Sequence, residues 1–254
     1  MAEQATLPRG TKPEGAVSEQ DASRRVREMF TRIAPRYDLL NHLLSAQLDR
    51  RWRARTAREL RTVLLNPQAV VLDLCCGTGD LAFSLAKEAK ARIVGADFSH
   101  TMLVRAKDKS ESEARGGWRV PFFEADALGL PFADGSFDLV TTAFGFRNLA
   151  NYQEGLKEIL RVLKPGGTLG ILDFTEPAPG IVGDTYRFYF QKVLPKIGGM
   201  ISGDAAAYAY LPKSVARFFR PDELAGVMKQ AGFESVRYSL MTLGSVALHI
   251  GRKG

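Results

Sequence analysis

The sequence predicts an α/β fold built on a doubly wound, Rossmann-like parallel sheet. Its 254 residues suit one large domain, and 45% hydrophobic with 25% charged residues is typical of a soluble globular protein. From about residue 69, short β-rich runs alternate with helical segments, which indicates parallel strands with helices on both faces. The last two strands are separated by the link 241–244, which is too short for a parallel crossover. We therefore predict seven strands, five of them parallel and the last two forming an antiparallel hairpin.

Seven runs rich in β-branched, aromatic and aliphatic residues account for these strands. They are expected at residues 69–74, 91–97, 120–126, 136–144, 168–174, 233–240 and 245–251. Helices are expected at residues 79–89, 99–109, 151–163 and 221–231. The turn sequence Lys164-Pro165-Gly166-Gly167 is expected to stop the third of these helices before the fifth strand begins.

The N-terminal part of the chain has a different pattern. Residues 1–20 are polar, contain Pro and Gly and lack periodicity, so we predict a mobile and dispensable tail. Apolar residues then recur at helical spacing, and residues 21–66 are predicted to form a helical cover that is interrupted at Pro35. A second departure is the insert 175–220, which is rich in Tyr and Phe. We expect one domain over residues 21–254 that includes both segments.

Several classes of protein are disfavoured by the composition. The longest apolar runs fall short of the ~18 residues that a transmembrane helix needs. Residues 1–16 carry charges and no apolar stretch, so we expect no signal peptide and a cytoplasmic protein. Adjacent cysteines such as Cys75 and Cys76 rarely form a disulfide, and no His or Cys accompanies them at ligand spacing. The sequence therefore predicts neither a disulfide scaffold nor a metal site.

The charge of the chain is uneven. The net charge is +7, and six arginines lie within residues 50–61, a stretch with a single acidic residue. Such a cluster is consistent with the solvated face of a helix. It is equally consistent with a surface that meets an acidic partner, such as a membrane or a nucleic acid.

Polar residues at the predicted strand ends point to a ligand site. The first strand ends in an acid, Asp73, followed by the turn Gly77-Thr78-Gly79, where glycines allow close approach of a ligand. The second and third strands end at Asp97 and Asp126. At the edge where parallel strands end, Asp97 can accept two ribose hydroxyls and Asp126 can face a purine. We infer a nucleoside site; because acids surround the loop, a ligand that is cationic there is favoured over a pyrophosphate.

The motifs around this site resemble those of a known family. The sequences DLCCGTGD, GADFSHTML, ADALGLPFADGSFDLV and RVLKPGG are similar to the motifs of class I S-adenosylmethionine-dependent methyltransferases. The segments FTRIAPRYDLLNHLLS, AFGFRNLANY, LPKIGG and YAYLPKSV, with the C-terminal stretch, resemble more narrowly the UbiE/MenG/COQ5 quinone C-methyltransferases. The resemblance runs from about residue 23 to the end.

The resemblance implies S-adenosylmethionine as the methyl donor, and no metal. The cofactor contacts that it implies, together with the strand-end residues, are Asp73, Gly77, Thr78, Gly79, Asp97, Asp126, Ala127 and Ala143. Relatives often have Ser at position 143, so here only backbone groups are offered. The implied reaction is C-methylation of a polyprenyl quinol ring, most of all demethylmenaquinol to menaquinol. A 2-methoxy-6-polyprenyl-1,4-benzoquinol is the second candidate acceptor.

The chemistry requires a group that stabilises or removes a proton from a quinol hydroxyl. Arg147 and Asn148 follow the fourth strand, where Arg147 could hold a phenolate and Asn148 could orient a hydroxyl or a water. Tyr37, on the helical cover, could close over the ring. These three are the predicted catalytic residues.

Partners and alternatives stay open at this point. The aromatic insert is either plain core, burying Phe188, Phe190, Tyr208 and Tyr210, or the wall of a channel for a polyprenyl tail. In the second case the arginines of segment 50–61 would support transient contact with the inner face of the cell membrane. A homodimer is compatible with the sequence. The alternative functions are methylation of another small molecule and a basic nucleic-acid-binding protein, against which no RNA-binding module is visible.

Overall fold

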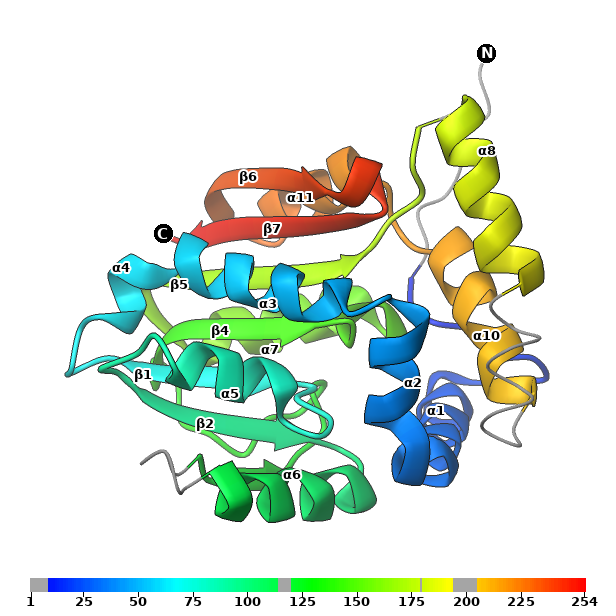
Figure 1. Cartoon of the computed structure of the whole chain (residues 1–254). Helices are drawn as coiled ribbons and strands as arrows, with labels where there is room; N and C mark the ends of the chain where they lie inside the picture. The colour runs from blue at the N-terminus through cyan, green and yellow to red at the C-terminus, as the bar shows by residue number, and fades with distance from the viewer. Residues whose placement is uncertain (1–8, 114–119, 179, 194–204) are drawn as a thin grey trace.

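The computed structural model describes residues 9–113, 120–178, 180–193 and 205–254. Within these residues one sheet has the strand order β3-β2-β1-β4-β5-β7-β6 (Figure 1). The strands β1 to β5 pair in parallel, and β7 is antiparallel to both β5 and β6, so the predicted sheet with its C-terminal hairpin is confirmed. The strands are β1 (Val70–Leu74), β2 (Arg92–Asp97), β3 (Phe122–Glu124), β4 (Phe137–Ala143), β5 (Leu163–Phe174), β6 (Phe233–Met241) and β7 (Val246–Lys253).

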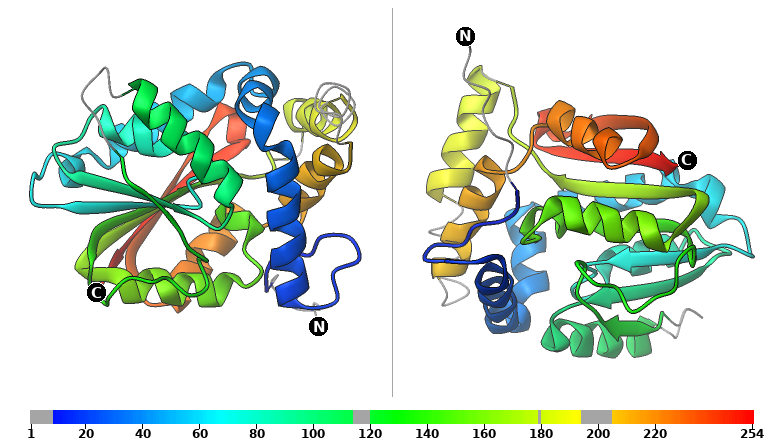
Figure 2. Two further views of the ribbon diagram at one scale, coloured as in Figure 1. Left: turned by 90° about the horizontal axis from the view of Figure 1, so that it is seen from below. Right: turned by 180° about the vertical axis from the view of Figure 1, so that it is seen from behind.

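Helices cover both faces of this sheet. In Figures 1 and 2, α3 and α5 lie on one face, whereas α7 and α11 lie on the other. The helices α1, α2, α8 and α10 gather instead at the edge where the parallel strands end. The helical elements are α1 (Glu19–Ile33), η1 (Ala34–Arg36), α2 (Tyr37–Leu44), α3 (Leu48–Glu59), α4 (Arg61–Leu64), α5 (Asp80–Ala86), α6 (His100–Glu113), η3 (Phe146–Asn148), α7 (Tyr152–Val162), α8 (Ile181–Phe188), η4 (Tyr189–Val193), α10 (Ala205–Ala216), α11 (Pro221–Gln230) and η5 (Thr242–Gly244).

Two apolar clusters hold the helices to the sheet. The α7 face buries Leu156 and Ile159 completely against the strands, and the α3 face buries Ala57. The central strands are apolar along both faces, because each is covered by helices on both sides. Full burial of one such Leu or Ile side chain is worth roughly 1.5–3 kcal/mol. This packing fixes the strand ends and the loops that follow them.

The predicted turn at residues 164–167 does not separate a helix from a strand. β5 begins at Leu163, which pairs with Phe137, and the pairing resumes with Thr168 opposite Leu139. The extra residues form an irregularity within the strand, where Gly166 adopts a positive φ of 74°. Glycine tolerates this conformation, so the sequence signal for a turn was correct locally but marks a bulge.

Residues 9–18, which we call the N-terminal strap, belong to the segment predicted as a mobile tail but make defined contacts with the fold; residues 1–8 lie outside the described structure. The Thr11 amide donates to the Leu149 carbonyl at 2.7 Å, and the Tyr152 amide donates to the Arg9 carbonyl at 2.8 Å. The side chain of Ser18 caps α1 by accepting from the Asp21 amide at 3.1 Å. Backbone hydrogen bonds hold this segment in place. Such bonds require no apolar side chains, so the sequence of the segment shows no apolar periodicity.

Candidate functional site

A cavity lies at the ends of β1, β2 and β4, and we call it the strand-end cavity. The fold brings together here most of the residues that the sequence singled out. Those on its wall are Tyr37, Gly77, Asp97, Asp126, Ala127, Ala143 and Asn148. The convergence of three strand ends follows from the parallel topology, which places all carboxyl ends at one edge.

Asp97 is the central acid of the strand-end cavity. Its Oδ2 accepts from the Gly77 amide at 2.9 Å and its Oδ1 accepts from the Ser99 amide at 2.9 Å. A carboxylate has about four acceptor positions, so two stay available for a pair of hydroxyls. Burial raises the pKa of the Asp97 carboxyl to about 6, although the backbone donors of Ser99 and Gly77 counteract the shift.

Asp126 lies beyond the end of the short strand β3. One carboxylate oxygen accepts from the Leu128 amide at 3.0 Å, and the next residue, Ala127, is buried. Both residues and Leu128 contribute to the wall of the strand-end cavity. The arrangement offers an acceptor and small apolar groups to a flat ring, as predicted for a purine.

The loop after β1 forms a small recess that adjoins the strand-end cavity. Asp73 lies at its base and is fully buried; the Thr141 hydroxyl donates to its Oδ1 at 3.2 Å, whereas Oδ2 has no partner among the described residues. Burial raises the pKa of Asp73 to about 7. Cys75, on the same loop, has a positive φ of 55°, a strained conformation for a residue with a Cβ. A buried acceptor without a donor indicates that a cationic or hydrogen-bonding ligand group belongs here.

Gly79 does not line either space. It has a φ of 85° and precedes α5, and a Cβ there would come within 2.8 Å of the Phe83 ring. Its amide donates to the Cys76 carbonyl at 2.9 Å. Gly79 therefore shapes the turn that carries Gly77 and Thr78, which do line the recess.

A second, larger cavity of about 300 Å³ lies between α1, α2, α3, α8 and α10, and we call it the apolar cavity. Its lining is mainly aromatic and aliphatic and includes Met29, Ile33, Trp52, Phe174, Tyr186, Phe190, Tyr210 and Leu211. The insert thus supplies part of the cavity wall. Of the two phenylalanines that the core interpretation would bury, Phe190 is buried, whereas Phe188 is 64% exposed. The predicted role of the Tyr208 side chain lies outside the described residues.

Three aromatic residues separate the two cavities. Phe30, Tyr37 and Phe144 contribute to the walls of both. Phe144 has a φ of 59°, and its ring packs against the Phe174 ring at a tilt of 37°, with 4.7 Å between the centroids. The residue after Phe144 packs tightly against the β1 loop, since a Cβ on Gly145 would lie 2.4 Å from Cys75 Cβ. The strained backbone at Phe144 aims its ring at the junction between the cavities.

The neighbours Arg147 and Asn148 face different cavities. Arg147 lines the apolar cavity, whereas Asn148 lines the strand-end cavity. Arg147 Nη1 donates to Asp173 Oδ1 at 2.8 Å and also to the Phe144 carbonyl, and the Arg147 Nε–H is buried without a partner among the described residues. The helical turn η3 therefore supplies a charged group to one cavity and an amide to the other.

Tyr37 lies on both walls, as expected for a residue that closes over a ring. Burial raises its pKa above the ordinary value of tyrosine, although a hydrogen bond with Asn41 lowers it. The phenol therefore stays protonated at neutral pH. It can donate a hydrogen bond.

The residues 18–253 match the model of the ubiE/COQ5 methyltransferase family. The chain belongs to this family. It is 53% identical to the demethylmenaquinone methyltransferase of Thermus thermophilus, over 88% of this chain and 99% of the relative. It is 48% identical to the protein of the same name from Deinococcus radiodurans, over 92% of this chain and 95% of the relative. The ubiquinone/menaquinone biosynthesis C-methyltransferase UbiE of Geobacter sp. (strain M21) is 44% identical, over 90% of this chain and 96% of the relative.

Solved structures share the fold at low sequence identity. The cyclase SpnF superimposes with a TM-score of 0.68 at 20% identity, covering 95% of this chain and 99% of the other. An S-adenosylmethionine-dependent methyltransferase from Thermotoga maritima gives a TM-score of 0.60 at 22% identity, covering 89% and 99%. The class I methyltransferase fold of this family member is thus shown.

As a member of this family the protein uses S-adenosylmethionine, and the residues at the strand ends fit that cofactor. The unpartnered Oδ2 of Asp73 matches a ligand with a positive charge, and the free acceptor positions of Asp97 match two ribose hydroxyls. Asp126 can accept from a purine amino group. When bound, the cofactor supplies an electrophilic methyl group.

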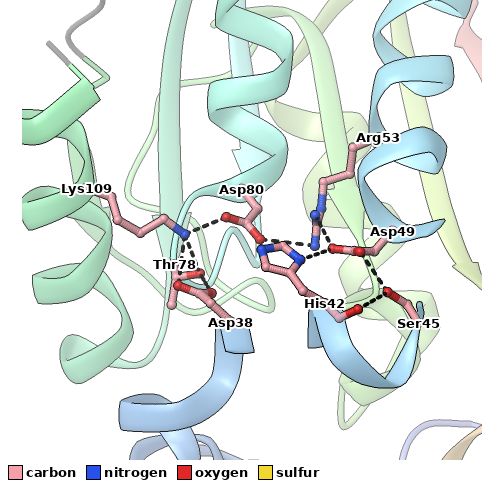
Figure 3. Close-up of polar contacts among 8 residues, drawn as sticks. All are labelled: Asp38, His42, Ser45, Asp49, Arg53, Thr78, Asp80 and Lys109. Atoms are coloured by element: carbon pink, nitrogen blue, oxygen red, sulfur yellow. Dashed lines mark hydrogen bonds and ion pairs between the residues drawn. The ribbon is translucent and has the colours of Figure 1, made fainter. Parts of the chain in front are cut away.

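A polar network of eight side chains joins the helical cover to the β1 loop, and we call it the clamp network (Figure 3). The Thr78 hydroxyl donates to Asp38 at 2.5 Å, and Lys109 donates to Asp38 at 3.0 Å and to Asp80. The hydroxyl of the predicted cofactor residue Thr78 is thus committed to α2. The remaining members are His42, Ser45, Asp49 and Arg53.

Arg53 differs from the other arginines of segment 50–61, which are exposed on α3 and at the start of α4. It is buried and donates to Asp49 at 2.7 Å and pairs with Asp80 at 3.2 Å. The side-chain N and O atoms of His42, Asp49 and Asp80 lie within 4.8 Å of one another. Among the described residues, these three are close enough together to hold a metal ion. The guanidinium of Arg53 supplies positive charge to both carboxylates of this group.

Sequence reasoning missed Asp173, and for Tyr210 it offered core packing or a channel wall but no polar role. Asp173 at the end of β5 is buried and pairs with Arg147, and Tyr210 on α10 donates to Asn148 Oδ1 at 3.0 Å. Asp173 is, like Asp97, an acid at a strand end, so the same signal could have found it. Tyr210 had no such signal, because its partner is far away in the sequence.

Proposed function

We propose that this protein transfers a methyl group from S-adenosylmethionine to a ring carbon of demethylmenaquinol, giving menaquinol. The 2-methoxy-6-polyprenyl-1,4-benzoquinol of ubiquinone biosynthesis is the second candidate acceptor. The names of the two relatives at 53% and 48% identity support the first assignment. The relative at 44% identity is named for both pathways and supports the wider one.

The observation that carries the proposal is the shared wall of Phe30, Tyr37 and Phe144. A cofactor in the polar strand-end cavity and an apolar acceptor in the larger cavity would meet at these three rings. Transfer to carbon requires in-line alignment and exclusion of water, and alignment can contribute up to roughly 7–11 kcal/mol. A closed, aromatic junction provides both.

The proposed catalytic residues act on the quinol oxygen. The guanidinium of Arg147, which lines the apolar cavity, is the proposed donor for a developing phenolate. A guanidinium stays protonated at any working pH, so Arg147 stabilises the charge and does not remove the proton. Asn148 orients a hydroxyl or water that carries the proton away. Protonated Tyr37 packs over the quinol ring and donates a hydrogen bond to the quinol oxygen.

Contact with a membrane completes the proposal, because a polyprenyl quinol resides in lipid. Exposed apolar side chains adjoin the lining of the apolar cavity in sequence: Leu39 and Leu43 on α2, Phe188 on α8, and Leu243 in η5. No helix among the described residues is long and apolar enough to cross a membrane. These side chains, with the exposed arginines of α3, support transient docking on the inner face of the cell membrane, at ~1 kcal/mol per basic residue near an anionic leaflet.

The experiment offers the purified protein equal amounts of both quinols under reducing conditions, with S-adenosylmethionine. Mass spectrometry of the products is expected to show menaquinol as the main methylated species. Methylation of the benzoquinol alone would overturn the first assignment, and methylation of neither would overturn the function. Light scattering of the same preparation tests the homodimer, which stays a prediction.

A further inference from the structure

The turn η3, which carries Arg147 and Asn148, is held by hydrogen bonds from distant parts of the chain. The Tyr152 hydroxyl donates to the Arg147 carbonyl at 2.9 Å, and the Thr11 amide donates to the Leu149 carbonyl at 2.7 Å. Tyr210, on α10, donates through its hydroxyl to Asn148 Oδ1 at 3.0 Å. The turn therefore depends on the N-terminal strap, on α7 and on α10 at the same time.

The hydrogen bonds at Tyr210 have a defined direction. A tyrosine hydroxyl has one proton, which here goes to Asn148 Oδ1. The Thr11 hydroxyl lies 2.6 Å from the same oxygen of Tyr210 and must then donate to it. A chain of two hydrogen bonds thus runs from the strap through Tyr210 to the amide oxygen of Asn148.

This chain fixes which end of the Asn148 amide is turned toward the junction of the cavities. With Oδ1 held by Tyr210, Nδ2 donates to the Phe144 carbonyl at 3.3 Å. In the reverse orientation Oδ1 would face the Phe144 carbonyl, which is a second acceptor, and the Tyr210 hydroxyl would have to accept from Nδ2 and donate to Thr11 instead. Asn148 lines the strand-end cavity and Phe144 lines both cavities, so the amide nitrogen, with one N–H left after its bond to Phe144, lies near where the cavities meet.

We infer that Tyr210 is a positioning residue that, with Thr11, holds the amide of Asn148 in its donor orientation at the site of methyl transfer. The inference rests on the proposed function, in which Asn148 orients a hydroxyl or water. It extends that function to the N-terminal strap, because Thr11 belongs to the strap and supplies the first hydrogen bond.

A purely structural Tyr210 would behave differently. Its ring also lines the apolar cavity, so a packing role would change stability or the KM for the quinol. A positioning role through Asn148 changes kcat and depends on Asn148 being present. Tyr210→Phe keeps the ring and removes only the hydroxyl, which makes the two roles distinguishable.

The test is a double-mutant cycle of Tyr210→Phe and Asn148→Ala, measured for kcat, for both KM values and for melting temperature. Tyr210→Phe is expected to lower kcat about tenfold, the size of one lost hydrogen bond, with little change in either KM. In the Asn148→Ala background the same change should have no further effect on kcat. Thr11→Val should lower kcat about threefold. Tyr238→Phe, which removes an exposed hydroxyl on β6, is the matched control and should equal the wild type.

An NMR measurement tests the inference without any substrate. The side-chain amide signals of Asn148, identified by their loss in Asn148→Ala, should move in Tyr210→Phe and not in Tyr238→Phe. An unchanged Asn148 signal in Tyr210→Phe would overturn the inference, as would an equal loss of kcat in both backgrounds of the cycle. A wild-type protein that methylates no quinol would overturn the proposed function and leave the NMR result to decide the positioning role.

Discussion

Arg147 and Asp173 form a buried ion pair beside the apolar cavity, with 2.8 Å between Nη1 and Oδ1. Asp173 also accepts from the backbone amide of Arg147 at 3.0 Å. Burial raises the pKa of Asp173, whereas the Arg147 charge acts to lower it. The pair orients the guanidinium, so a stabilising role and the proposed role toward the quinol oxygen fall on one side chain.

We expect Asp173→Ala to destabilise the protein by about 3–5 kcal/mol, because it leaves the buried charge of Arg147 without a partner. The double variant Arg147→Met, Asp173→Leu should regain most of this stability, since it removes both charges. Denaturant unfolding measures both changes.

The same double variant separates stability from chemistry. Loss of one preorganised donor typically costs ~10²–10³ in turnover, so the folded double variant should be slower by at least this factor in single-turnover methylation. Its affinity for S-adenosylmethionine should stay near that of the wild type. A folded double variant with near-normal rates would remove Arg147 from the mechanism, and a collapse of cofactor affinity would move it to the binding site.

Asp97→Ala should weaken S-adenosylmethionine binding at least tenfold, or ~1.4 kcal/mol, without unfolding the protein. The variant loses the ribose acceptor and also frees the amides of Gly77 and Ser99, which Asp97 now holds. Calorimetric titration gives the affinity, and circular dichroism checks the fold. Wild-type affinity in a folded variant would defeat the assignment.

Cofactor binding should release protons near neutral pH. In the ligand-free protein the pKa values of Asp97 and Asp73 are raised to about 6 and about 7, and a cationic ligand favours their ionised forms. Affinity should therefore fall as the pH falls through this range, and the binding heat at about pH 6.5 should depend on the ionisation enthalpy of the buffer. Buffer-independent heats at this pH would contradict the coupling.

The same shifts have the opposite sign for stability. Between about pH 4 and pH 7 the folded protein binds more protons than the unfolded chain, whose carboxyls titrate near ~3.9. The contribution of Asp73 and Asp97 to the free energy of unfolding is therefore lost as the pH rises through this window. Replacing Asp73 by Asn should flatten this dependence in the ligand-free protein.

Deletion of residues 2–17, which leaves the Ser18 cap in place, should lower the melting temperature by several degrees and reduce turnover. It removes the strap hydrogen bonds to Leu149, Tyr152 and Tyr210. Scanning calorimetry and a quinol assay measure the two effects. Full stability and activity in the deleted protein would restore the view of this segment as a dispensable tail.

The sequence predicted the sheet and the acids at three strand ends, because alternation and strand-end position are local signals. It could not predict the pairing of Arg147 with Asp173 or of Tyr210 with Asn148, which join residues 26 and 62 positions apart. The strap was missed for a related reason, since backbone hydrogen bonds at Arg9 and Thr11 require no particular side-chain pattern. Polar contacts between residues far apart in the sequence can be identified only from the folded structure.

A single-turnover reaction with S-adenosylmethionine carrying a trideuterated methyl group tests the central claim, which is transfer between the two cavities to a quinol carbon. We predict that the label appears on a ring carbon of demethylmenaquinol, in an amount equal to the active enzyme. Label on a quinol oxygen, on added RNA, or on no acceptor while the cofactor is bound would contradict the account.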